Sequence, residues 1–132
     1  MYQTASGQEQ WVALRTADVH LNSMSRLSIG WQGLGAIDGD ADVVVHEGQK
    51  LGLWVGDVPF TFSTGRYRVE HPLGPKARIR VYAGMVRHRL DTYGAGTEIT
   101  AESRETQTTI TARDADGRRR PPVTLTNNAI RP

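Results

Sequence analysis

The chain contains no cysteine among its 132 residues. Without thiols it can form no disulfide framework, no cysteine nucleophile and no cysteine-based zinc site. Core-forming residues are also scarce, since leucine, isoleucine, valine and phenylalanine total 28 residues, little more than in disordered chains. The length still predicts a single domain. Its core is thin, so either polar arms dilute the composition or neighbouring subunits contribute to stability.

Long hydrophobic runs are absent as well. No apolar stretch in the sequence approaches the roughly 20 residues that a membrane-spanning helix needs. The first ten residues lack the basic start and the apolar segment of a signal peptide. We therefore expect a soluble protein that is synthesised in the cytoplasm and has no membrane partner.

Lysine is rare, and charge is unevenly distributed. Arginine supplies 14 of the 16 cationic side chains, and it forms bidentate and interfacial contacts better than lysine does. Residues 1–57 carry three basic and seven acidic side chains, whereas residues 58–132 carry thirteen and seven. Copies of a chain whose two halves carry opposite net charge can dock head to tail. A homo-oligomer is therefore predicted.

Alternation of apolar and polar residues is the main structural signal. Ala77, Ile79, Val81 and Ala83 are predicted to face inward, and after Gly84 the pattern resumes with Val86, His88 and Leu90. Gly84 is either a tight turn or a bulge in one long strand. Turn signals about every 8–12 residues predict an all-β, mainly antiparallel sandwich or barrel. Strands are expected at 27–31, 43–45, 51–55, 60–62, 66–71, 77–83, 86–90, 97–113 and 123–125.

Both ends of the chain are polar. Residues 1–10 are predicted to be a flexible N-terminal arm, residues 11–126 a single β-domain, and residues 127–132 a C-terminal tail. Two stretches could form either a strand or a short helical turn, namely residues 11–22 and 101–107.

The most site-like segment is Asp38-Gly39-Asp40-Ala41-Asp42. Carboxylates at alternate positions resemble the opening of a calcium loop. An EF-hand loop that begins at Asp38 would need glycine where Val43 stands and glutamate where Gln49 stands. We predict a solvated turn between strands, with a calcium site on Asp38, Asp40 and Asp42 as the alternative. No other cofactor is indicated.

Catalytic motifs are not apparent. The glycine-rich segment 30–35 lacks the Lys-Ser/Thr pair of a phosphate-binding loop. The four histidines have no metal-like spacing, and no nucleophile-elbow pattern is present. The sequence therefore predicts a protein that is not an enzyme.

Arginines occupy the outward positions of several predicted strands. This face could contact a protein subunit, bind nucleic acid through arginine and aromatic side chains, or remain solvated. Arg118-Arg119-Arg120 adds a mobile basic patch. The candidate residues are Arg66, Arg68, Arg78, Arg80, Tyr82, Arg87 and Arg89.

The segment from Lys76 to Val86, followed by Ile99 in a further strand, resembles tail-hub β-domains of tailed bacteriophages, in which a strand leads into a Gly-Xaa-Val step. The cysteine-free, Gly- and Thr-rich composition with polar arms is similar to that of small virion structural proteins. This resemblance implies a non-enzymatic protein of a phage tail, neck or capsid surface, located in the virion. It also implies that the arginine face and the arms bind neighbouring subunits. Nucleic acid is the alternative partner.

Overall fold

The computed structural model describes residues 1–30, 34–71 and 74–126. All strand pairs in these ranges are antiparallel, which confirms the predicted all-β class. No helix that could cross a membrane occurs in them. The strands are β1 (Tyr2–Gln3), β2 (Gln10–Ala13), β3 (Ala17–Leu21), β4 (Arg26–Ile29), β5 (Gly35–Val55), β6 (Val58–His71), β7 (Lys76–Ala83), β8 (Met85–His88), β9 (Asp91–Gly94), β10 (Glu98–Arg104), β11 (Gln107–Arg113) and β12 (Val123–Thr126).

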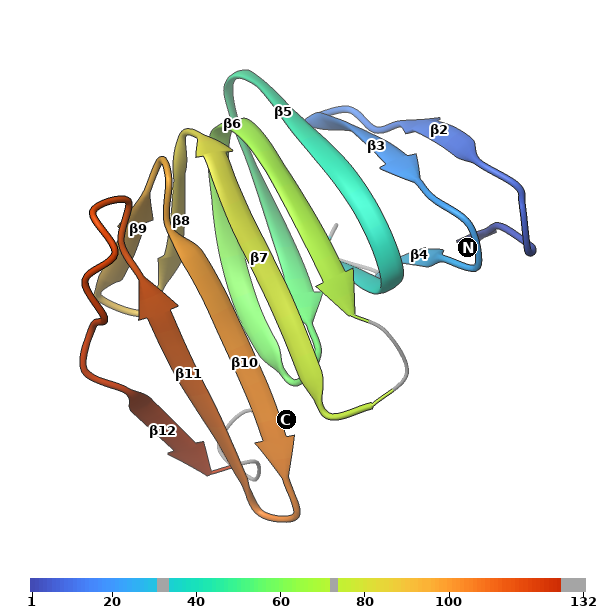
Figure 1. The fold of residues 1–132 in the computed structure, drawn as a ribbon. Coiled ribbons are helices and arrows are strands. Elements are labelled where there is room, and N and C mark those ends of the chain that lie inside the picture. The colour runs from blue at the N-terminus through green and yellow to red at the C-terminus, as the bar shows by residue number, and fades with distance from the viewer. Residues whose placement is uncertain (31–33, 72–73, 127–132) are drawn as a thin grey trace.

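The long β5–β6 hairpin folds over on itself and creates two layers (Figure 1). Its open end joins β3, β4, β7, β10, β11 and β12 in a front layer, and its closed end joins β8 and β9 in a rear layer. The fold-over brings Leu53 against Gly35 and Gly56 near Ala77. The inner faces of the two layers therefore enclose the core, and their outer faces point in opposite directions.

A bend at Gly84 carries the chain from the front layer to the rear layer. β7 and β8 both pair with β6, on either side of this glycine. Gly84 is therefore a bulge between two parts of one long strand and not a tight turn. Gly84 has a φ of 98°, a conformation that glycine adopts without steric cost. The Tyr67 hydroxyl accepts a hydrogen bond from Met85 N at 3.0 Å and donates one to the Ser63 carbonyl at 2.6 Å. Tyr67 thereby ties the two bent strands together.

The core is one continuous cluster of buried hydrophobic side chains between the layers. In β6 the buried positions change parity, from Phe60 and Phe62 in the rear layer to Tyr67 and Val69 in the front layer. A register shift in the β5–β6 pairing between Val45 and Lys50 accompanies this change. Apolar residues of both strand halves thus face the same interior, because the irregularity compensates for the fold-over.

Residues 1–10, predicted as a flexible arm, are anchored instead. Tyr2 and Gln3 pair with β4, and the buried Thr4 hydroxyl accepts a hydrogen bond from Ser25 N at 2.9 Å. These contacts use backbone and hydroxyl groups, so they produce no hydrophobic periodicity in the sequence. The prediction for residues 127–132 lies outside the described residues.

The two undecided stretches are strands. Residues 11–22 contain most of β2 and all of β3, and residues 101–107 lie in the β10–β11 hairpin. Two side chains predicted to face inward are exposed: Ala83 beside the Gly84 bend, and Leu90, which is 98% exposed. Leu90 lies outward because β8 ends at His88 and Arg89 turns the chain with a φ of 55°.

Candidate functional site

The outer face of the front layer carries a continuous row of cross-strand neighbours. Register places these side chains on one face of seven adjacent strands, where opposite residues lie within side-chain contact. Three further side chains lie on the same face, each two residues along its strand from Arg68 or Arg80, namely Arg66, Arg78 and Tyr82. The row consists of Trp11, His20, Asp42, Arg68, Arg80, Glu98 and Arg113.

Two of the predicted arginines do not belong to this face. Arg87 pairs with Thr61 in the rear layer, and Arg89 lies in the turn between β8 and β9. The single face predicted for all six arginines is therefore wrong, because the bend at Gly84 turns the outward side of β8 to the opposite surface. Five of the seven candidate residues, counting Tyr82, remain together.

Acidic partners contact three arginines of the front face. Arg68 contacts Asp40 at 2.5 Å, Glu70 at 3.1 Å and Asp42 at 3.3 Å. Glu98 similarly lies 3.3 Å from Arg78 Nε and 3.8 Å from Arg80 Nε. The face is an alternating ionic lattice, so its net charge is far smaller than the arginine count indicates.

The segment Asp38–Asp42 lies inside β5 and is not the predicted solvated turn. Gly39 makes this possible, because Ser25 and the Met24 carbonyl pack where a side chain would project. Asp38 forms a 2.8 Å ion pair with Arg26, while Asp40 and Asp42 pair with Arg68. No group of three or more ligand-type side chains able to hold a metal occurs within the described ranges. The calcium hypothesis therefore gains no support from the geometry.

Burial and the surrounding charges shift the pKa values of Asp40 and Arg68. Burial raises the pKa of Asp40 above its ordinary value, because Arg68 offsets only part of the desolvation and both Glu70 and Asp42 add negative potential. Burial alone would lower the pKa of Arg68, but the combined field of the three carboxylates leaves it raised. The Arg68 guanidinium is thus the fixed cation that lets three carboxylates share one sheet face.

A cleft of about 1,050 Å³ borders this cluster beside the N-terminal strand. Asp38, Asp40, Arg68, Glu70 and His71 line it from β5 and β6. His71 Nδ1 lies 3.3 Å from Asp38 Oδ1 without a well-aligned hydrogen bond. Charged side chains of both signs line the cleft, and Arg68 pairs there with Asp40 and Glu70.

Exposed aromatic and apolar side chains lie on the same face, and we call Trp11, Val44, Arg66 and Tyr82 the aromatic patch. Trp11 is 65% exposed, Tyr82 46% and Val44 38%. Trp11 stacks on His20 with ring centroids 4.5 Å apart, and the Arg66 guanidinium lies 5.5 Å from the Tyr82 ring centroid. The sequence prediction missed Trp11 and Val44. Strict period-2 reading of Val43–Val45 would have placed Val44 outward.

The basic run near the C-terminus is ordered, contrary to the predicted mobile patch. Arg120 contacts Asp114 at 2.8 Å, donates to the Thr92 carbonyl and lies 4.7 Å from the Tyr93 ring centroid. Arg119 forms a β-bridge with Arg113. Arg120 therefore fastens this segment to β9 in the rear layer.

Neither a protein-family model nor a curated protein matches the chain. Two solved structures of a protein from Parabacteroides distasonis ATCC 8503, described as a "putative anti-sigma factor", are similar, with TM-scores of 0.65 and 0.64 and 16% identity. In both cases the match covers 87% of this chain and 60% of the other. The chain thus spans less than two thirds of its structural neighbours, and at this identity the likeness shows that the fold is shared.

Proposed function

We propose that this chain is a non-catalytic protein-binding domain that contacts its partner through the aromatic patch. The observation that carries the proposal is the placement of Trp11, Arg66 and Tyr82 on one exposed sheet face. Tryptophan, tyrosine and arginine are the residue types that dominate binding hot spots. Their stacking on neighbouring side chains orders them before binding, which reduces the entropy lost in a complex.

The ionic lattice favours a protein over nucleic acid as the partner. A polyanion gains affinity by releasing counterions from free cationic groups. On this face the central arginines already contact carboxylates, which would repel phosphates. The competing carboxylates are Asp40, Asp42, Glu70 and Glu98.

The structural neighbours indicate which kind of partner to test first. Because they belong to a protein described as a "putative anti-sigma factor", we propose a regulatory contact, with a sigma factor as the first candidate. The bacteriophage structural role stays a prediction. It would use the same face, with a second copy of this chain or a virion protein as the partner.

Quantitative affinity capture with matched variants tests the proposal. Wild type, Trp11→Ala, Tyr82→Ala and the rear-layer control Arg87→Ala would each be immobilised, and captured proteins identified by mass spectrometry. We expect Trp11→Ala and Tyr82→Ala each to weaken binding of the partner by about 30-fold, the effect of losing a hot-spot residue. Arg87→Ala should bind like wild type.

The identity of the captured protein separates the alternatives. A sigma factor supports the regulatory role, whereas a virion protein or a second copy supports the structural role. Partner binding that is equally strong in all four proteins would refute the aromatic patch as the contact surface. DNA binding that weakens with salt and is lost in Arg66→Ala would favour nucleic acid instead.

A further inference from the structure

The segment after the turn at residues 114–117 runs back along β11 as an edge strand and leaves a hollow. Arg113 bridges Arg119, and Ile110 pairs with Val123, so two intervening residues of β11 face three of the returning segment. Pro121 and Pro122 lie in this bulge, where neither can donate a hydrogen bond to β11. The hollow beside them has a volume of about 480 Å³, within the size range of small-molecule sites.

Two arginines face each other directly at this hollow. Hydrogen bonds from Asp114 N to the Arg118 carbonyl and from Arg120 N to the Ala112 carbonyl flank the Arg113–Arg119 bridge. The two arginines therefore form a non-hydrogen-bonded antiparallel pair, the arrangement in which opposite side chains come closest. Like charges in this position are destabilising unless something neutralises them.

The nearby carboxylates are engaged elsewhere. Glu98 is the cross-strand neighbour of Arg113, but its carboxylate pairs with Arg78 and Arg80. Asp114 is paired with Arg120. Within the described part of the chain, neither Arg113 nor Arg119 forms an ion pair. Their two charges therefore lack a carboxylate partner, unlike those of Arg68, Arg78 and Arg80.

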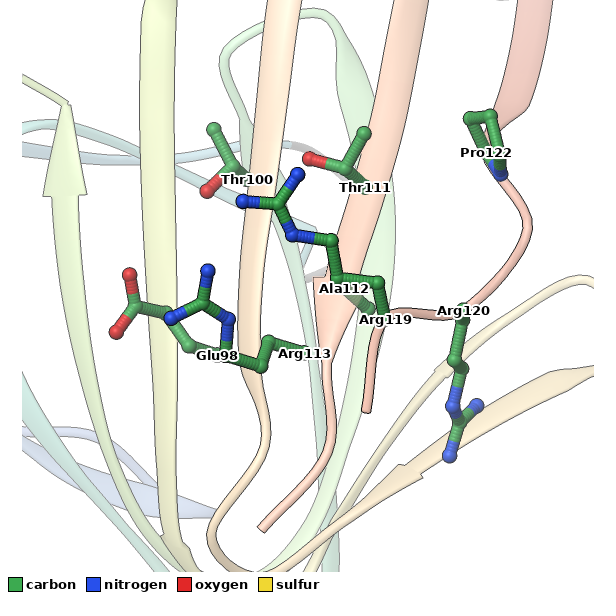
Figure 2. A pocket seen from close by; sticks show the side chains of 8 residues that line it. All are labelled: Glu98, Thr100, Thr111, Ala112, Arg113, Arg119, Arg120 and Pro122. Atoms are coloured by element: carbon green, nitrogen blue, oxygen red, sulfur yellow. The ribbon is translucent and has the colours of Figure 1, made fainter. Parts of the chain in front are cut away.

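Hydroxyl groups complete the lining. Thr100 and Thr111 are cross-strand partners on the same face as the two arginines. Figure 2 shows the Arg119 side chain reaching toward Thr100 and Thr111, whereas Arg120 points away from them. Guanidinium forks and threonine hydroxyls are the donors that bind planar or tetrahedral oxyanions in proteins.

We propose that Arg113 and Arg119 bind an oxyanion in this hollow, with Thr100 and Thr111 as additional hydrogen-bond donors. The ligand is a small molecule that carries a phosphate or a carboxylate group, since both present oxygens to a guanidinium fork. Ala112 and Pro122 line the same hollow and offer contact to an apolar part of the ligand. This site is separate from the aromatic patch and does not depend on the protein contact proposed above.

Titration calorimetry at constant ionic strength tests the site, with inorganic phosphate and acetate as separate probes and chloride as the reference anion. We expect Arg113→Gln and Arg119→Gln each to weaken binding about tenfold or more, because each removes charge-assisted hydrogen bonds. Arg118→Gln is the matched control. It removes a charge from the same run, but Arg118 does not line the hollow.

A second measurement needs no ligand. At low ionic strength Arg119→Gln should raise Tm by about 2 °C, because it removes the repulsion between the two arginines, and Arg118→Gln should not. Binding of phosphate alone identifies a phosphorylated ligand, and binding of acetate alone a carboxylated one. Equal affinities in all three variants, or no binding of either probe above chloride, would overturn the proposal.

Discussion

The bend at Gly84 yields the sharpest test of how this sheet folds over. Gly84 has a φ of 98°, where a non-glycine residue costs about 1–2 kcal/mol. A Cβ at this position would also collide with the Tyr67 hydroxyl and the Thr64 carbonyl. Forcing atoms into such a packed site costs about 1–3 kcal/mol more. We therefore expect Gly84→Ala to lower the free energy of unfolding by about 3 kcal/mol, within the combined range of about 2–5 kcal/mol.

Gly48 provides the matched control, because it separates backbone strain from steric collision. Its φ is 73°, and nothing lies within 4 Å of an added Cβ. Gly48→Ala should therefore cost only the backbone term, about 1 kcal/mol. For a domain of this size 1 kcal/mol corresponds to about 4 °C in Tm, so the expected losses are about 12 °C for Gly84→Ala and about 4 °C for Gly48→Ala.

Urea denaturation followed by tryptophan fluorescence, together with calorimetry, would measure both variants. Adding Tyr67→Phe tests the mechanism further, because phenylalanine lacks the hydroxyl that the new Cβ would meet. Gly84→Ala should then cost less in the Tyr67→Phe background than in wild type, a coupling visible in a double-mutant cycle. Equal losses for the Gly84 and Gly48 variants, or strictly additive effects with Tyr67→Phe, would refute this account of the bend.

Two further predictions concern buried and paired charges. Burial lowers the pKa of His88, so below about pH 6.5 the unfolded chain binds a proton more readily than the folded chain does. The free energy of unfolding therefore falls with pH, by at most about 1.4 kcal/mol per pH unit. His88→Phe should reduce this pH dependence in urea denaturation between pH 7 and pH 5, and an unchanged slope would contradict the prediction. Arg68→Gln should lower the free energy of unfolding by about 1–2 kcal/mol at pH 7, and by less at acidic pH, where the raised pKa of Asp40 lets this carboxyl become protonated. Arg87→Gln should change it by less than about 0.5 kcal/mol, and equal effects of the two arginine variants would show that the ion pairs contribute nothing.

The strand content of the protein could be predicted because its signal is local. Alternation of apolar and charged residues in the segment from Lys76 to Ala83 places Ile79 and Val81 in the core and Arg78 and Arg80 outside, as each strand's pleat requires. The turns at Gly56 and Gly117 also have a local signal, since glycine next to aspartate is typical of turns and a turn is complete within four residues.

The anchored N-terminus was missed because its signal is not local. Tyr2 and Gln3 are held by the backbone of β4, more than 20 residues away, and backbone pairing leaves no trace in side-chain periodicity. The strand identity of Asp38–Asp42 was missed for a related reason. Asp and Gly ordinarily indicate a turn, but here Ser25, just before β4, and Arg68 of β6 stabilise them inside a sheet.

The sequence by itself determined the all-β class, the inner and outer positions of most strands and the abundance of outward arginines. The tertiary structure decided which of those arginines share a face and which remain uncompensated. The bend at Gly84 sends Arg87 to the rear layer, register gives Arg68 its three carboxylates, and the returning C-terminal segment sets Arg119 against Arg113. The physical reason is that charge compensation acts over distances in space, whereas sequence patterns report only neighbours along one strand.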